Sequence, residues 1–192
     1  FVDFHYAKEI DCTIRQIARA AVQEDGRVFA VVGPALVPIH SSFGQVSGSQ
    51  NIVMVRGVFG GETWFSGSGA GGAPTAVAVV SDLLSIGRHA PRDPGPPGAN
   101  VVAEVSNDFV APHYVRFMVA DRPGILAEVC SAFARHGINI EAVVQLPRYR
   151  KDRLPFVATL EPCAASVLGR ALDDIGHFDF HVEPPLALPI LL

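Results

Sequence analysis

The sequence has few cysteines, few charged residues and no long apolar run, and each scarcity excludes a class of protein. Its three cysteines lie far apart and form no Cys-x-x-Cys pair, which argues against a disulfide framework and against a zinc site. No apolar run reaches the roughly 18 residues of a membrane span, so we expect a soluble protein. Lysine and arginine number 15 against 19 aspartates and glutamates, and this net charge of -4 argues against nucleic-acid binding.

The chain does contain enough apolar residues to bury a core. Hydrophobic residues make up 49% of the 192, which excludes disorder and suits one large domain or two small ones. The low cysteine content makes a reducing cytoplasm the expected compartment. The chain begins with Phe1 and shows no signal-peptide pattern, so we expect a fragment of a longer cytoplasmic protein.

A run rich in proline and glycine divides the sequence. Residues 92–100 read Arg-Asp-Pro-Gly-Pro-Pro-Gly-Ala-Asn, a composition that suits neither a helix nor a central strand. We therefore predict four segments: an N-terminal part over residues 1–91, a linker over 92–112, a C-terminal module over 113–186 and a tail over 187–192.

The pattern of the N-terminal part predicts one long helix followed by short strands. Apolar residues recur at helical spacing at Tyr6, Ile10, Ile14, Ile17 and Ala21. With Asp3 as the N-cap, this spacing predicts a helix over residues 4–22. Three short apolar stretches then predict strands over residues 28–32, 51–58 and 63–65, the last two joined by a hairpin turn at Gly60-Gly61.

The C-terminal module alternates between strand and helix patterns. The order is strand, helix, strand, strand, helix, strand over residues 114–119, 125–134, 138–145, 155–160, 164–174 and 178–182. This βαββαβ order predicts a ferredoxin-like α+β module in which four antiparallel strands carry two helices on one face. RNA-recognition modules share the order, but they need aromatic residues on the central strands, and residues 116–119 and 139–145 supply only Phe117, so we expect no RNA binding.

A glycine-rich run follows the last N-terminal strand and opens a helix. Residues 67–76 read Gly-Ser-Gly-Ala-Gly-Gly-Ala-Pro-Thr-Ala, and Pro74 suits the first helical turn. Glycine lets the backbone approach a ligand closely, although such a run by itself is more often a tight turn against a neighbouring segment. The run is not a Rossmann fingerprint, because no acidic residue follows it on a second strand, so we expect no nucleotide-binding domain within this chain.

Several motifs of the N-terminal part carry a family resemblance. They are Tyr6-Ala7-Lys8-Glu9, Pro34-Ala35-Leu36-Val37-Pro38, Val46-Ser47-Gly48-Ser49-Gln50-Asn51 and, above all, the glycine run with Pro74-Thr75-Ala76 and Ser81-Asp82-Leu83. Together these motifs resemble the later part of the catalytic and dimerisation domain of homoserine dehydrogenase. The resemblance implies a partial α/β domain with a mixed sheet over residues 1–91.

The resemblance also implies an activity and a cofactor. Homoserine dehydrogenases are oxidoreductases that use NADP or NAD to interconvert L-homoserine and L-aspartate 4-semialdehyde in threonine, methionine and isoleucine biosynthesis. In that family the glycine turn approaches the nicotinamide, which implies cofactor contacts at Gly71, Gly69 and Ala70. The family's Rossmann domain, acidic substrate-binding residues and catalytic lysine are expected before Phe1, so we expect no catalytic residue in this chain and no activity of the fragment alone.

A turn with binding potential lies between the first strand and the first helix of the C-terminal module. It reads Asp121-Arg122-Pro123-Gly124-Ile125-Leu126, and the free amides at the start of the helix can meet a carboxylate. A plain capped turn explains these residues equally well. Together with Gly137-Ile138-Asn139-Ile140-Glu141 and Gln145, however, the turn resembles an ACT domain, a regulatory module that binds amino acids.

In the ACT family, modules pair side by side and bind their effectors at the pairing interface. The resemblance therefore implies a homodimer or higher oligomer, allosteric regulation by L-threonine, and effector contacts at Asp121, Gly124, Ile125, Leu126, Asn139 and Ile140. The amide of Asn139 can donate to and accept from an amino acid, but it equally suits a residue that bonds its own backbone. An alternative function is a non-catalytic amino-acid sensor whose N-terminal part serves only as a dimerisation platform.

Two further groups of residues remain outside the resemblance. Basic residues surround Tyr149 at positions 148, 150, 151 and 153, which predicts a solvated hairpin tip, with an anion or partner site as the alternative. The seven histidines show no metal-site spacing within a helix, so we expect no metal.

Overall fold

The chain divides into two units that are not consecutive in sequence. The computed structural model describes residues 1–23, 26–88, 104–147 and 149–191. Unit 1 comprises Phe1–Gly44 and Ala103–Leu192, and unit 2 comprises Gln45–Val102. The first residues of the chain therefore fold with the C-terminal module. Residues 92–103 of the predicted linker lie outside the described residues, and the predicted segment boundaries stay a prediction.

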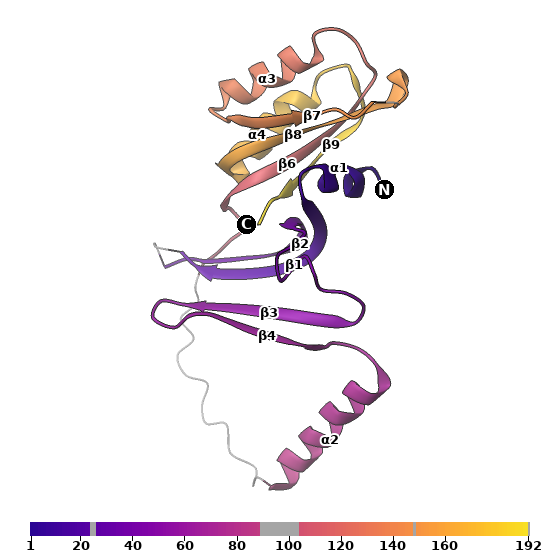
Figure 1. Ribbon diagram of the computed structural model, residues 1–192. Coiled ribbons are helices and arrows are strands. Elements are labelled where there is room, and N and C mark those ends of the chain that lie inside the picture. The colour runs from indigo at the N-terminus through magenta and orange to yellow at the C-terminus, as the bar shows by residue number, and fades with distance from the viewer. Residues whose placement is uncertain (24–25, 89–103, 148, 192) are drawn as a thin grey trace. The chain divides into compact units, whose positions relative to one another are not determined.

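The elements of unit 2 are inserted between the two segments of unit 1 along the chain (Figure 1). Unit 1 contains α1 (Val2–Glu9), β1 (Cys12–Val22), β2 (Val28–Pro38), β5 (Val105–Ser106), β6 (Val110–Val119), α3 (Ile125–Arg135), β7 (Ile140–Val144), the 3-10 turn η1 (Lys151–Arg153), β8 (Leu154–Ala164), α4 (Ala165–Gly176) and β9 (His181–Pro189). Unit 2 contains β3 (Gln50–Gly57), β4 (Gly61–Ser68) and α2 (Gly72–Arg88).

The C-terminal module has the predicted βαββαβ fold. Its strands lie in the order β7-β8-β6-β9 and every pair is antiparallel. Helices α3 and α4 cover one face of this sheet (Figure 1). The apolar stripe of α3, with Val129 and Phe133, packs with Leu168 of α4 and with Phe117 of β6 in one core. The predicted α+β class is confirmed.

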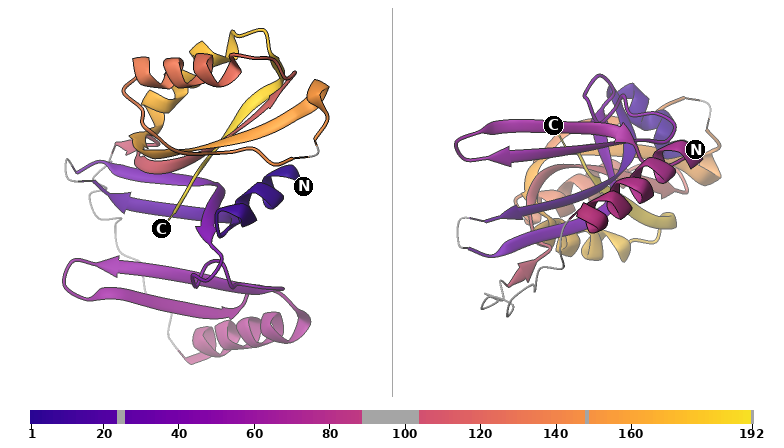
Figure 2. Two further views of the ribbon diagram at one scale, coloured as in Figure 1. Left: turned by 45° about the horizontal axis from the view of Figure 1, so that its top comes forward. Right: turned by 90° about the horizontal axis from the view of Figure 1, so that it is seen from below.

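The opposite face of the same sheet is covered by the start of the chain. Helix α1 lies across the sheet from α3 (Figure 2, left). A second apolar cluster joins Tyr6, Ala7, Cys12 and Leu36 to Tyr114, Val157, Leu188 and Ile190. Because both faces are covered, β6 and β8 consist largely of buried residues rather than alternating between buried and exposed ones.

The predicted helix over residues 4–22 is wrong beyond its first two turns. Helix α1 ends at Glu9, and Asp11 turns the chain with a φ of 52°, a conformation that aspartate tolerates better than most residues. Residues 12–22 form β1, which pairs along its whole length with β2. This pairing overrides the helical spacing of the isoleucines and alanines. Asp3 is not the N-cap, a position that Phe1 occupies.

The other predicted elements are present, and several strands are longer than predicted. Strand β2 continues to Pro38, and β9 runs over His181–Pro189 instead of residues 178–182. The last residues of β9 therefore pair with β6, although they fall in the predicted tail. The following residue, Ile190, forms a parallel bridge with Leu36. These pairs tie the end of the described chain to its beginning.

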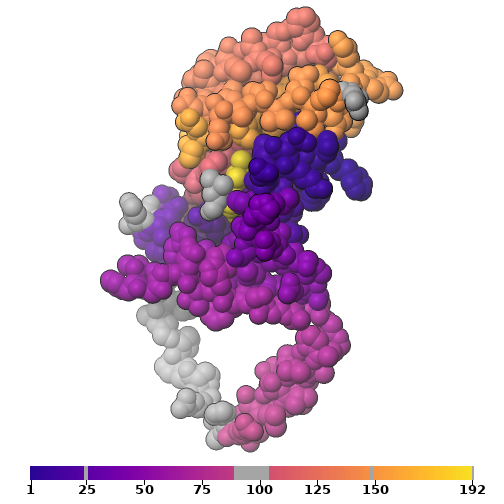
Figure 3. Space-filling view, viewed as in Figure 1, coloured from indigo at the N-terminus to yellow at the C-terminus, as the bar shows by residue number. Residues whose placement is uncertain are grey.

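Unit 2 consists of a hairpin and a helix with little burial. Strands β3 and β4 pair antiparallel around the predicted turn, where Gly61 has a φ of 65° that favours glycine. Helix α2 (the pink atoms at the lower right of Figure 3) has no buried residue among the residues that the structure describes. Its apolar side chains are largely exposed, with Val77 at 67% and Leu83 at 63%.

The residues that the structure describes contain neither a membrane-spanning helix nor a cluster of metal-binding side chains. No helix among them is long and apolar enough to cross a membrane. No group of three or more histidine, cysteine, aspartate or glutamate side chains is placed to hold a metal ion in the same residues. The longest helix, α2, has 17 residues and includes Asp82 and Arg88.

A buried histidine on β6 makes stability depend on pH. His113 is 3% exposed, and its burial lowers the pKa of the imidazole from 6.5 because the charged ring loses its water. The unfolded chain therefore takes up a proton below about pH 6.5 that the folded chain does not, so the free energy of unfolding falls as the solution becomes more acidic. We expect His113→Gln to remove up to about 1.4 kcal/mol of this loss per pH unit.

Urea unfolding at about pH 7.5 and about pH 5.5 measures this effect on the free energy of unfolding. His177→Gln, which removes an exposed imidazole after α4, is the matched control. Equal acid sensitivity in the parent and in His113→Gln would contradict the assignment.

Candidate functional site

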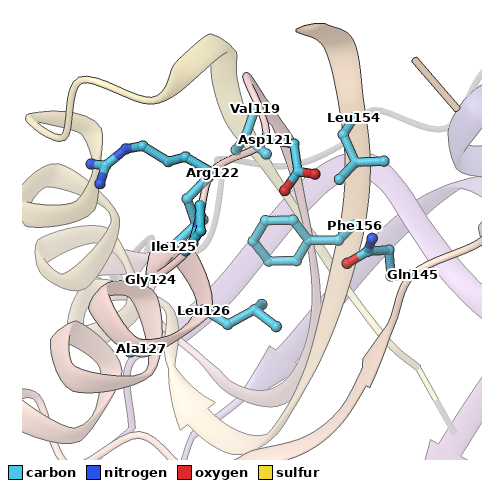
Figure 4. Close-up of a pocket in the computed structure, with 11 residues that line it drawn as sticks. Val119, Asp121, Arg122, Gly124, Ile125, Leu126, Ala127, Gln145, Leu154 and Phe156 are labelled. Carbon is cyan, nitrogen blue, oxygen red and sulfur yellow. The ribbon is translucent and has the colours of Figure 1, made fainter. Parts of the chain in front are cut away.

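The loop between β6 and α3 borders a hollow of about 340 Å³. It is lined by Val119, Asp121, Arg122, Pro123, Gly124, Ile125, Leu126, Ala127, Gln145, Leu154 and Phe156. The carboxylate of Asp121 and the amide of Gln145 lie beside the ring of Phe156 (Figure 4). The hollow thus combines an apolar floor with one acidic and one amide side chain.

The backbone of this loop leaves the start of α3 open. Gly124 occupies the N-cap with a φ of 100°, a left-handed conformation that glycine adopts readily, and no side chain among the described residues caps the helix. The first helical bond runs from Glu128 N to Gly124 O at 3.0 Å. The preceding amides therefore have no helical partner and carry the positive end of the helix dipole at the hollow.

Ion pairs around the hollow leave Asp121 as its principal charge. Arg122 is held away by Glu128 at 3.2 Å and by Asp179 at 2.8 Å. Lys151 Nζ lies 3.6 Å from Asp121 Oδ2, but its side chain is 88% exposed, so this pair contributes little. The Asp121 carboxylate is consequently available to a cationic group that enters the hollow.

The six predicted effector contacts fall into two groups. Four of them, Asp121, Gly124, Ile125 and Leu126, line the hollow, whereas Asn139 and Ile140 do not. Asn139 Nδ2 donates to Glu161 Oε2 at 3.1 Å, and Ile140 pairs with Leu160. The start of β7 lies beside the end of β8 because the two strands are antiparallel, whereas the hollow is lined by the start of β8. An effector role for either group stays a prediction.

Gln145 is a site residue that the sequence analysis did not assign to the effector. It belongs to the motif that resembles an ACT domain, and it directly follows β7, at the end that reaches the hollow. A polar residue directly after the apolar run Ala142-Val143-Val144 was the available signal. Its position beside the loop depends on the register of β7 against β8, which the sequence does not reveal.

The glycine turn of unit 2 connects β4 to α2, as predicted. A Cβ on Gly69 would overlap the side-chain amide of Asn51, so a close approach within the unit accounts for this glycine. Gly71 has a φ of 125°, and its carbonyl oxygen accepts from Thr75 N at 3.1 Å and Thr75 Oγ1 at 2.8 Å. Gly69, Ala70 and Gly71 are all exposed, and their contact with a cofactor stays a prediction.

The basic residues around Tyr149 each have an acidic neighbour where the structure describes them. The pairs are Arg150–Asp152, Lys151–Asp121 and Arg153–Glu183. Arg148 lies outside the described residues. These pairs favour the solvated hairpin tip over an anion site.

Comparison with known proteins assigns a family to both parts of the chain. Residues 2–84 match the family described as Homoserine dehydrogenase, and residues 113–175 match the ACT domain. The homoserine dehydrogenase of Mycobacterium leprae is 37% identical over 151 residues, which cover 74% of this chain and 34% of the relative. That of Synechocystis sp. is 34% identical over 203 residues, which cover 99% of this chain and 47% of the relative.

Solved structures agree with this assignment. A homoserine dehydrogenase from Thiobacillus denitrificans has a TM-score of 0.84 at 26% identity, and the match covers 99% of this chain and 45% of that chain. A Staphylococcus aureus homoserine dehydrogenase shares the fold with a TM-score of 0.63. The chain spans 34% of the length of the Mycobacterium leprae relative and 47% of the length of the Synechocystis relative. It therefore belongs to the homoserine dehydrogenase family and carries an ACT domain in its C-terminal half.

Proposed function

We propose that the protein to which this chain belongs is a cytoplasmic NAD(P)-dependent homoserine dehydrogenase whose ACT domain binds L-threonine. The family match over residues 2–84 supports the first half of the proposal. The second half is carried by one observation: a carboxylate, open helix amides and an apolar floor meet in one hollow. Its volume of about 340 Å³ lies within the usual range of small-molecule sites.

The groups of the hollow complement the two charges of an amino acid. The carboxylate of Asp121 suits the α-ammonium group, and the amides of Ile125 and Leu126 suit the α-carboxylate. Gln145 can donate to or accept from a hydroxyl group. Leu154 and Phe156 provide apolar contact for the rest of the side chain.

The second group of predicted contacts suits a homodimer. Strand β7 is an edge strand of its sheet, so its outer hydrogen-bonding groups are free to pair with a second copy. An antiparallel β7–β7 pair places the start of one strand opposite the end of the other. Asn139 and Ile140 of one copy would then approach the hollow of its partner, beside Gln145.

The dehydrogenase part contributes the glycine turn. We assign Gly69, Ala70 and Gly71 to contact with the nicotinamide end of NADP or NAD, which when bound accepts or supplies the hydride. The exposed, left-handed Gly71 leaves its backbone uncovered for such an approach. The residues that move the proton are expected outside this chain.

Asp121→Asn should weaken L-threonine binding about tenfold, because the neutral amide no longer offsets the ammonium charge. Isothermal titration calorimetry measures the affinity of the chain for L-threonine. Asp173→Asn is a matched control, since this exposed carboxylate lies on α4 and does not line the hollow. Absence of heat at about millimolar ligand, or equal affinity in both variants, would reject the effector site.

The activity is tested on the full-length protein by following NADPH or NADH formation from L-homoserine, with and without L-threonine. Activity that L-threonine suppresses supports both halves of the proposal. Activity that ignores L-threonine leaves the ACT domain structural or specific for another ligand. Absence of activity favours the non-catalytic sensor.

A further inference from the structure

Tyr6 connects α1 to the sheet that borders the hollow. Its side chain is fully buried, and its hydroxyl donates to Pro155 O at 2.7 Å and accepts from Leu146 N at 3.3 Å. The ring stacks on Tyr149 with centroids 6.3 Å apart. Burial raises the pKa of the Tyr6 phenol, so the hydroxyl keeps the proton that it donates.

Both backbone partners of this hydroxyl are neighbours of residues that line the hollow. Leu146 directly follows Gln145, and Pro155 lies between Leu154 and Phe156. Successive residues of a strand point to opposite faces, so β8 presents Leu154 and Phe156 to the hollow and its Pro155 to the side of α1. The phenol thus bonds backbone atoms that are covalently next to the lining residues, so a ligand that shifts the backbone of those residues would shift both partners of the phenol.

Helix α1 connects this contact to the dehydrogenase part of the chain. It lies within the matched residues 2–84 and continues through Asp11 into β1. Its first turn is fixed separately, because Asp3 Oδ1 accepts from Tyr114 Oη at 3.0 Å and from Arg116 Nε at 2.9 Å. The helix thus has one polar contact on β6 and a second one, through its tyrosine, beside the hollow.

We propose that the Tyr6 hydroxyl couples occupancy of the hollow to the position of α1, and through α1 to the dehydrogenase part. This coupling rests on the proposed effector site. Coupling between two sites is reciprocal, so a fixed α1 should also strengthen effector binding. The element that responds to the ligand is then the hydrogen-bonded unit formed by the α1 tyrosine, Leu146 and Pro155.

Hydrogen exchange of the α1 amides, with and without saturating L-threonine, tests the coupling in Tyr6→Phe. This variant keeps the buried ring and removes only the hydroxyl. Tyr149→Phe is the matched control, because it removes a hydroxyl from the stacked partner ring. We expect L-threonine to slow α1 exchange about fivefold in the parent and in the control, and we expect this slowing to be lost in Tyr6→Phe.

Calorimetry on the same samples separates the coupling from the effector site. Tyr6→Phe that binds L-threonine and retains the full slowing of α1 overturns the coupling. So does a parent chain that binds L-threonine without any change in α1 exchange, a result that does not depend on the variant's folding. A parent chain that does not bind L-threonine overturns the effector site itself, and the coupling with it.

Discussion

Replacing Phe117 with alanine should lower the free energy of unfolding of the C-terminal module by about 3–5 kcal/mol. The ring is fully buried at the centre of the sheet face that α3 and α4 cover. It stacks on Phe156 with centroids 4.9 Å apart and meets Phe133 edge-on at 6.3 Å. Alanine removes these contacts and leaves a cavity that the surrounding strands cannot close. Urea unfolding followed by circular dichroism measures the change.

Two control variants separate the effect of lost core packing from that of removing a phenylalanine as such. Phe117→Leu refills most of the space and should cost about 1 kcal/mol. Phe4→Ala removes a phenylalanine from α1 whose side chain is 53% exposed, and its effect should stay within about 0.5 kcal/mol. A Phe117→Ala variant as stable as Phe4→Ala would show that the ring does not support the core.

Replacing Arg116 with methionine should lower the free energy of unfolding by about 2–3 kcal/mol, the second largest expected effect. The guanidinium bridges Asp3 at 2.9 Å and Glu183 at 3.2 Å, and the arginine side chain is only 11% exposed. Methionine keeps much of the side-chain volume but leaves two partly desolvated carboxylates without this cation. The same unfolding measurement gives the change in free energy.

Arg153→Met is the matched control because Arg153 pairs with the same Glu183 from a side chain that is 55% exposed. Loss of this ion pair should lower the free energy of unfolding by less than about 1 kcal/mol, and this decrease should be smaller still at high salt. Equal effects of the two substitutions would contradict the view that burial sets the value of the Arg116 contacts.

The sequence predicted the elements whose signals are local. The α3 stripe of Val129 and Phe133 and the turn at Gly60-Gly61 each specify their own structure. The helix prediction for residues 12–22 was wrong because Ile14 and Ile17 suit a helix and a strand alike. Only pairing with β2 decides between the two structures. The packing of α1 on the module has no local signal at all.

The candidate site divides in the same way. The loop from Asp121 to Leu126 could be found because its turn residues are consecutive. Gln145 could not, since the register between β7 and β8 brings it to the hollow. Asn139 was grouped with the loop through the ACT resemblance, whereas the antiparallel course of β7 along β8 places it at the other end of the pair.

The bond from Tyr6 to Pro155 spans 149 residues, and this span sets the order in which the chain can fold during synthesis. A ribosome that adds about 5–20 residues per second takes about 7–30 s to travel from one partner to the other. Throughout that interval the apolar side of α1 has no sheet to cover it. Cutting a gene at the proline-glycine run would make the exposure permanent, leaving Tyr6 bare on one product and Tyr114 and Val157 bare on the other.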